Sequence, residues 1–313
     1  MGSVCGSKVV RVGSQKPLPS TQESLNKPRV SRKKDLLQGN SLKTLKKHKP
    51  KKFRKLLKKQ LNPETRWEVW KAALNFQADH ERFVQLISNP TQHSFSIEKD
   101  VERTFPNHTF FTKDTQAALR NVLLAFSSSA EDIGYCQGLN YVAGVLLVVS
   151  KGNQSETFGM LELLCCQFGI KGLFQKGFPL VMKMCEVFHS ELSDQMPELQ
   201  ELLQKHGIDD NFWLVKWFLT LFSVSMKLED VVRVWDNLFA KGLGFIVNVA
   251  LAIAKQLKHQ LLNSSDVLEV ISKCTLEHFN VEKTLKIAKQ FKKLKSCDFK
   301  TRNFSILTEV TPL

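Results

Sequence analysis

The chain has 313 residues, of which 42% are apolar and 24% are charged, a composition typical of a soluble globular protein that can bury one large core or two smaller ones. Its net charge of +15 is unevenly distributed, because residues 1–60 carry +16 and residues 61–313 sum to −1. The longest apolar stretches, residues 142–149 and 245–254, fall far short of the roughly 20 residues that a membrane span needs, so we expect no transmembrane segment.

Several kinds of site are excluded by patterns that the sequence lacks. It has no G-x-x-x-x-G-K-[ST] or G-x-G-x-x-G loop, so it is not expected to bind a nucleotide unaided, and no G-x-S-x-G elbow of a triad hydrolase. Its eight histidines form neither H-E-x-x-H nor a Cys/His cluster, so no metal site is predicted. Seven cysteines, odd in number and without C-x-x-C spacing, indicate reduced thiols of a cytosolic protein.

The first 45 residues are rich in Ser, Gly, Gln, Asn and Pro, which predicts a disordered segment. Residues 1–8 resemble a myristoylation signal, with Gly2 as the acceptor and Cys5 as a neighbouring palmitoylation site. Gly6 stands where the pattern asks for Ser or Thr, and an ordinary unmodified start is the alternative.

Residues 43–59 contain ten Lys and Arg and no acid, and we predict that they complete a disordered basic tail over residues 1–60. Phe53 is the only aromatic residue in this run, fewer than nucleic-acid readers interleave, so no specific nucleic-acid partner is expected. An anionic membrane surface needs only the charge, at about 1 kcal/mol per basic residue. A nuclear-localisation signal and a solvated charge run are the alternatives.

The globular part is expected to begin near Leu61. In residues 63–70, Pro63 suits a helix start, and Arg66 and Trp70 stand four residues apart, as for an aromatic ring packed inward beside a partly buried cation. We favour a salt-bridged framework role for Arg66 over direct contact with a partner.

Residues 97–106 read I-E-K-D-V-E-R-T-F-P. Asp100 and Arg103 are three residues apart and therefore share one helix face. Pro106 disfavours helical geometry at Phe105, which puts Arg103 near the helix C-terminus, where its side chain can swing outward. For such a pair in isolation, a surface ion pair is the expected interpretation.

A loop between two helices is predicted around residues 133–140, which read I-G-Y-C-Q-G-L-N. Before it, residues 115–126 have apolar positions at i, i+3, i+4 and i+7, which is typical of an amphipathic helix; after it, residues 142–149 are apolar all round, as in a buried helix. The serines at 127–129 and the two glycines break the periodicity, so Tyr135 and Gln137 are expected on a displayed loop.

Further helices are predicted over residues 213–222, after an Asn211 cap, and over 228–239, closed by Gly242. Trp235 and Asp236 are interpreted as core and helix-packing residues without chemistry. No segment alternates with period two over a useful length, which predicts an all-α fold.

The segments I-x-x-D-x-x-R-T-F-P and G-Y-C-Q-G-x-N, in this order, resemble the TBC domain family, the GTPase-activating proteins of Rab GTPases. The resemblance runs from about Pro63 to about Leu294 and includes V-x-R-V-W-D-x-L-F in the second half. At its start, Leu61 and Asn62 replace the Gly-Ile of the family. It implies a multi-helix TBC domain of two helical subdomains at residues 61–295, with a C-terminal tail at 296–313.

The resemblance also implies roles for the two displayed side chains. Phosphoryl transfer needs a cation for the phosphate charge and a polar group that orients water, and Arg103 and Gln137 would supply these in trans. Asp100 would orient the guanidinium and Tyr135 would support the loop or bind the GTPase. Gly138 and Arg66 complete the supporting motif. GTP and Mg²⁺ would be held by the partner GTPase, so no cofactor of the chain's own is expected.

These patterns indicate a Rab GTPase-activating protein of membrane traffic, cytoplasmic and peripheral on an endomembrane or the plasma membrane. A membrane-tethered scaffold that binds a Rab GTPase without accelerating hydrolysis is the alternative. A nucleic-acid-binding protein is disfavoured because the excess charge is confined to the tail. Whether the chain counts as an enzyme stays open, since it would have no independent active site.

Overall fold

The structure is a computed structural model that describes residues 39–299, apart from residue 90 and the short segments 273–275, 277–278 and 295–298. The predicted acylation sites at Gly2 and Cys5 and the tail beyond residue 299 lie outside the described residues. The described part consists of helices joined by turns and contains no strand, which confirms the predicted all-α class.

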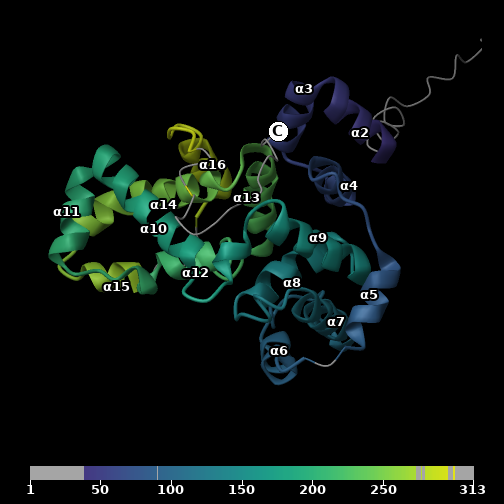
Figure 1. Ribbon diagram of the computed structural model, residues 1–313. Helices are drawn as coiled ribbons and strands as arrows, with labels where there is room; N and C mark the ends of the chain where they lie inside the picture. The colour runs from purple at the N-terminus through teal and green to yellow at the C-terminus, as the bar shows by residue number, and fades with distance from the viewer. Residues whose placement is uncertain (1–38, 90, 273–275, 277–278, 295–298, 300–313) are drawn as a thin grey trace, which may run out of the picture.

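Two groups of helices lie on either side of α13 (Leu228–Lys241), with α5 to α9 on one side and α10 to α12 and α14 to α16 on the other (Figure 1). The N-terminal helices are α2 (Gly39–His48), α3 (Pro50–Leu57), α4 (Pro63–Ala73), α5 (His80–Ile87), α6 (Ser94–Glu102), α7 (Lys113–Ser129), α8 (Leu139–Val149) and α9 (Gln154–Cys166). The later ones are α10 (Pro179–Gln195), α11 (Pro197–Lys205), α12 (Leu214–Leu219), α14 (Gly244–Leu262), α15 (Val267–Ser272) and α16 (Val281–Ala288), with the 3₁₀ turns η1 (Lys171–Leu173) and η2 (Asp210–Phe212).

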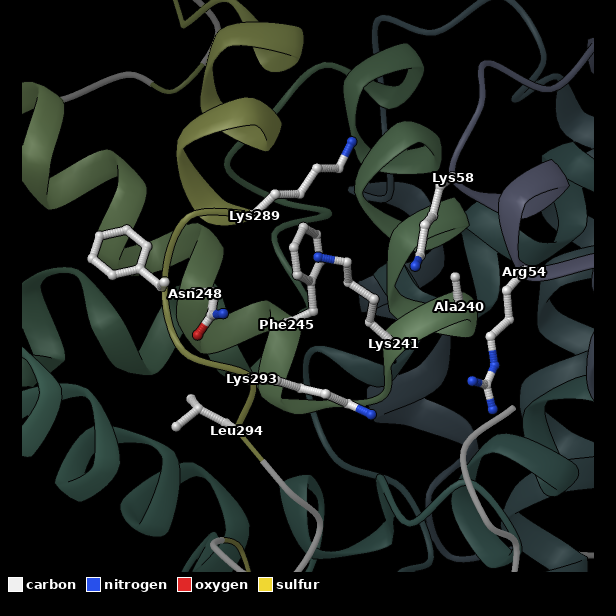
Figure 2. Close-up of a pocket in the computed structure, with 10 residues that line it drawn as sticks. Arg54, Lys58, Ala240, Lys241, Phe245, Asn248, Lys289, Lys293 and Leu294 are labelled. Atoms are coloured by element: carbon white, nitrogen blue, oxygen red, sulfur yellow. The ribbon is translucent and has the colours of Figure 1, made fainter. Parts of the chain in front are cut away.

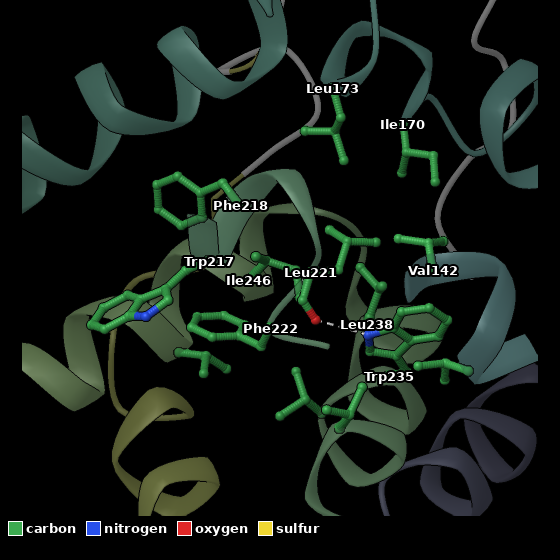
Figure 3. Close-up of a cluster of buried hydrophobic side chains, with 14 of the residues drawn as sticks. Val142, Ile170, Leu173, Trp217, Phe218, Leu221, Phe222, Trp235, Leu238 and Ile246 are labelled. Atoms are coloured by element: carbon green, nitrogen blue, oxygen red, sulfur yellow. Dashed lines mark hydrogen bonds between the residues drawn. The ribbon is translucent and has the colours of Figure 1, made fainter. Parts of the chain in front are cut away.

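One apolar cluster connects the two groups. It collects buried side chains from α8, η1, α12, α13 and α14, including Val142, Phe218, Trp235 and Ile246 (Figure 3). The indole Nε1 of Trp235 donates a hydrogen bond of 3.0 Å to the carbonyl oxygen of Leu221, which satisfies a buried polar group. The predicted all-apolar helix at 142–149 is part of this core as α8.

The predicted helix at 213–222 is wrong at both ends. Asn211 lies inside η2, where the Asp209 carboxylate accepts from its backbone N–H at 2.7 Å, and α12 ends at Leu219. Leu221 and Phe222 adopt left-handed φ values of 49° and 68°, although both side chains are fully buried. Apolar residues rarely accept this conformation, so core packing overrides the local helical pattern here.

The predicted start of the folded part at Leu61 is also wrong, because α2 and α3 pack against the rest of the domain. Leu42, Phe53 and Leu57 have no exposed surface, and α2 lies on α4 while α3 lies on α13. Each such side chain stabilises the fold by about 1.5–3 kcal/mol before the cost of ordering the segment. The basic tail therefore gives way to folded structure by Gly39.

Part of the lysine run is structural as well. The Nζ of Lys46 donates to the carbonyl oxygen of Ala73 at 2.7 Å and to Oδ1 of Asn75 at 2.8 Å, so it caps the C-terminal end of α4. Burial lowers the pKa of Lys46 to about 8. The basic run at residues 43–59 therefore contains a lysine that caps a helix, Lys46, and two buried core residues, Phe53 and Leu57.

Candidate functional site

Arg103 is the C-cap residue of α6, and its placement depends on the turn that follows it. Phe105 takes a left-handed φ of 47°, and its ring meets Tyr141 edge-on, with a centroid distance of 5.4 Å. The absence of a side chain at Gly144 on α8 permits this approach, since an added Cβ would lie 3.0 Å from the Phe105 ring and 3.1 Å from Cγ2 of Thr104. The turn after Arg103 is therefore seated directly on α8.

Asp100 joins Arg103 to the second motif. Its Oδ1 accepts from Nε of Arg103 at 2.7 Å and from Nη2 at 2.6 Å, while its Oδ2 accepts from the hydroxyl of Tyr135 at 2.5 Å. The carboxylate is buried, whereas half of the Arg103 side chain is exposed. One edge of the guanidinium is thus oriented by a rigid partner and the rest faces outward, as predicted.

The Asn140 side chain links the two motifs through hydrogen bonds to both. Its Oδ1 accepts from the N–H of Gly138 at 3.0 Å, and its Nδ2 donates to Oγ1 of Thr104 at 2.7 Å and to the carbonyl oxygen of Asp100 at 3.3 Å. The side chain is fully buried. Asn140 was quoted in the sequence pattern without a role, because only the fold shows that it faces the 97–106 segment.

Gln137 lies at the exposed tip of the loop between α7 and α8, as predicted. Gly134 has a φ of 59°, and a Cβ there would lie 2.3 Å from Nε2 of His93. Gly138 has a φ of 110° and is the N-cap residue of α8. Both positions therefore require glycine. Within the described part of the chain the Gln137 amide makes no hydrogen bond, so its donor and acceptor remain available to a partner.

The loop does not offer a nucleophile of its own. Burial raises the pKa of the Cys136 thiol to about 11, so it stays protonated at neutral pH. Burial and the hydrogen bond to Asp100 raise the pKa of Tyr135 as well. The described residues hold no group of three or more potential metal ligands. What the site presents is a cation and an amide.

Arg66, predicted to be one of the supporting residues, takes part in a different set of contacts. Its Nε lies 3.1 Å from Oδ1 of Asp236, which also accepts from Nε1 of Trp70 at 2.9 Å and, on Oδ2, from Nη1 of Arg233 at 3.0 Å. Desolvation raises the pKa of Asp236, while Arg66 favours its charged form. The favoured framework role of Arg66 agrees with this cluster, which ties α4 to α13.

An exposed aromatic residue beside Arg103 was missed. Phe95, Lys99 and Arg103 stand at i, i+4 and i+8 and so follow one face of α6 and its cap. Phe95 is 70% exposed, and Nζ of Lys99 lies 4.2 Å from its ring centroid. The sequence could have revealed it, because Phe95 does not share the helix face of the buried Ile97 and Val101. An exposed ring of this size marks a contact surface.

The all-α domain thus displays an arginine and a glutamine from two interlocked segments, a cation and an amide of the kinds that phosphoryl transfer uses. The model of the Rab-GTPase-TBC domain family matches residues 63–262, and the chain belongs to this family. The match covers both motifs, α13 and the whole of α14.

Comparisons with individual proteins agree. The chain is 33% identical over 178 residues to growth hormone-regulated TBC protein 1 of Rattus norvegicus, covering 56% of this chain and 61% of the relative. It is 30% identical over 190 residues to the GTPase-activating protein GYP5 of Saccharomyces cerevisiae, covering 60% of this chain and 21% of that protein. The crystal structure of the Chlamydomonas flagellar RabGAP TBC domain superposes with a TM-score of 0.68 at 24% identity, covering 82% of this chain and 92% of the other; it supports the fold.

Proposed function

We propose that this chain accelerates GTP hydrolysis by a Rab-family GTPase, with Arg103 as an arginine finger and Gln137 as a glutamine finger. The observation that carries the proposal is the lock between the two segments. Asp100, Tyr135 and Asn140 fix the backbone that bears both side chains, yet both functional groups stay exposed. A site that is to be completed by a partner needs this combination of rigid support and accessible tips.

Each finger has a defined task in phosphoryl transfer. The Arg103 guanidinium stabilises the charge that develops on the phosphate oxygens, and Asp100 keeps its planar fork oriented. The Gln137 amide accepts from the attacking water and donates toward the phosphate, so it orients the nucleophile. Phe95 offers apolar docking area on the same face as Arg103. GTP and Mg²⁺ belong to the partner GTPase, which leaves this chain without a cofactor.

The proposal is tested with the purified chain and a panel of GTP-loaded Rab GTPases, by following phosphate release in single-turnover reactions. Acceleration that depends on the concentration of this chain for at least one GTPase supports it. Binding to a GTPase without acceleration by any panel member would favour the scaffold alternative instead.

Tyr135→Phe tests whether the hydrogen bond between Tyr135 and Asp100 helps to position Arg103. Removing the hydroxyl deletes the bond to Asp100, and a hydrogen bond to a charged group contributes about 1.5–3 kcal/mol, so we expect the maximal stimulated rate to fall roughly tenfold. The apparent affinity for the GTPase should change little. Tyr141→Phe is the matched control, since its hydroxyl reaches only the backbone oxygen of Arg103, at 3.2 Å. Equal effects of the two variants would contradict a role for Tyr135 in positioning Asp100.

We also propose peripheral attachment to membranes. None of the described helices is long and apolar enough to cross a bilayer. The surface of α2 and α3 is strongly basic, and an acyl group on Gly2, with a second on Cys5, would add an anchor that does not depend on charge. The exposed basic side chains are Lys43, Lys47, Lys49, Lys51, Lys52, Lys55, Lys58 and Lys59.

A high-salt wash distinguishes attachment by the basic surface from attachment by an acyl group. Salt screens the attraction between charges, over about 8 Å at physiological ionic strength, but does not weaken acyl insertion. The wild-type protein, expressed in its own cells, should sediment with membranes and resist a high-salt wash. Gly2→Ala should become extractable by salt. The chain that begins at Gly39 should be soluble and retain its GTPase-activating rate. Identical fractionation of Gly2→Ala and wild type at high salt would rule out a functional acyl anchor.

A further inference from the structure

The two basic ends of the folded chain meet at one hollow. Its walls come from α3, the end of α13, the first turns of α14 and the segment that follows α16, and it encloses about 230 Å³ (Figure 2). Five basic residues line it: Arg54, Lys58, Lys241, Lys289 and Lys293. Among the residues that the structure describes, no carboxylate lines it. Two of them come from the N-terminal lysine run and two from a stretch about 235 residues later, so no local sequence pattern reveals the site.

The hollow is held open by well-packed structure. Nδ2 of the buried Asn248 donates to the carbonyl oxygens of Ala288 at 3.4 Å and Lys292 at 3.1 Å, which pins the segment that carries Lys289 and Lys293 to α14. Gly244 lets Leu294 approach, because an added Cβ would lie 2.6 Å from the Leu294 Cβ. On the other wall, α3 is anchored by Phe53 and Leu57. The cations therefore stand on a rigid frame.

The lysines of the hollow repel one another. Burial, together with the charges of Lys58, Lys289 and Lys293, lowers the pKa of Lys241 to about 8. The pKa of Lys289 is lowered mainly by burial. The charge of Glu282 opposes this shift, but Glu282 itself pairs with Arg233 at 2.8 Å. Among the described residues, none of the four lysines forms an ion pair with a carboxylate.

Some of these lysines, taken individually, can be explained by their positions at helix C-termini. Lys58 and Lys289 are C-cap residues and Lys241 is the last residue of α13, positions where a cation stabilises a helix by about 0.3–1 kcal/mol. The preference of helix C-termini for cations does not explain why the lysines of three helix ends line the same hollow. It also does not explain why Arg54 and Lys293 line it with them. Lysines that repel one another are instead expected to be held together in a rigid pocket when a bound anion neutralises their charges.

We propose that this hollow binds a compact ligand that carries two or more phosphate groups, such as an inositol phosphate, free or as the headgroup of a lipid. Five cations around a small volume match an anion whose charges are concentrated, rather than a nucleic-acid strand, which spreads its phosphates and stacks its bases on open aromatic faces. Two rings line the hollow, and each faces a lysine: Nζ of Lys241 lies 4.5 Å from the Phe245 ring centroid and Nζ of Lys255 lies 5.8 Å from that of Phe291. This binding goes beyond the proposed action on a GTPase.

Calorimetry with inositol 1,4,5-trisphosphate tests the site in the full chain. We expect saturable binding by wild type and at least tenfold weaker binding by Lys241→Gln/Lys293→Gln, because each removes a direct charge partner. Lys43→Gln/Lys51→Gln is the matched control: it removes the same charge from exposed positions of α2 and α3 outside the hollow and should bind like wild type. Lys289→Gln, on an exposed side chain, gives a second variant whose fold is not at risk.

Vesicles distinguish the two sources of the phosphates. Recruitment to vesicles containing phosphatidylinositol 4,5-bisphosphate, above that to phosphatidylserine vesicles of equal surface charge and lost in the hollow variant, identifies a lipid headgroup. Binding of the free trisphosphate without such recruitment identifies a soluble ligand. The trisphosphate should also raise the melting temperature of wild type and control but not of the hollow variant. No saturable binding, or equal losses in hollow and control variants, would overturn the proposal; neither readout involves a GTPase, so such failure leaves the proposed activity untouched.

Discussion

Arg103→Ala should lower stimulated GTP hydrolysis by about 10³-fold or more, the effect of losing an arginine finger, while the protein stays folded. We expect the fold to tolerate the change because half of the Arg103 side chain is exposed and, among the described side chains, only Asp100 accepts hydrogen bonds from it. Arg103→Lys should be nearly as impaired, since an ammonium cannot reproduce the planar fork that Asp100 holds. Single-turnover phosphate release measures the loss, and thermal melting confirms that the variants are folded.

A matched control for this change is Arg82→Ala. Arg82 is also about half exposed and pairs with a carboxylate, Glu162, but it lies on α5 outside the site. It should retain the wild-type rate. Stimulation near the wild-type level by Arg103→Ala would show that Arg103 is only a surface ion pair.

Gln137→Ala should lower the stimulated rate by about 10²–10³-fold, the cost of removing one positioned polar group from a transition state. Since the amide makes no hydrogen bond within the described residues, its loss should leave stability unchanged. Gln204→Ala, an exposed glutamine of α11, serves as the control.

The decisive partner for this experiment is a GTPase whose own water-orienting glutamine has been replaced. If Gln137 orients the water in trans, wild-type chain should still accelerate that GTPase. Loss of stimulation with the GTPase variant, together with full activity of Gln137→Ala, would show that the GTPase's own glutamine orients the attacking water. Gln137 would then not be a glutamine finger.

The sequence predicts those parts of the fold that depend on local periodicity. The amphipathic pattern before residue 126 appears as α7, which continues through the three serines expected to interrupt it. The hydroxyls of Ser128 and Ser129 donate to carbonyl oxygens of the same helix. Gly242 ends α13 as expected. The helices α2 and α3 carry an apolar pattern at Leu42 and Leu45 and again at Phe53 and Leu57, but a dense run of lysines concealed it.

The parts that could not be predicted depend on contacts between distant segments. The pairing of Arg66 with Asp236 spans 170 residues, and the role of Asn140 depends on how closely α6 approaches α8. The left-handed residues Leu221 and Phe222 lie where the Leu221 carbonyl oxygen accepts from the Trp235 indole, a contact that no local propensity encodes. Periodicity finds the helices, whereas the site requires their three-dimensional arrangement.

The chain contains two tyrosines, and both lie in the candidate site: the hydroxyl of Tyr135 contacts Asp100 and that of Tyr141 contacts the backbone of Arg103. Labelling with 3-fluorotyrosine would therefore place two ¹⁹F nuclei in the protein, one beside Asp100 and one beside Arg103. A spectrum of the labelled protein would report on the fingers alone, without assignment of the remaining 311 residues. Docking of a GTPase could then be followed as the movement of two resonances.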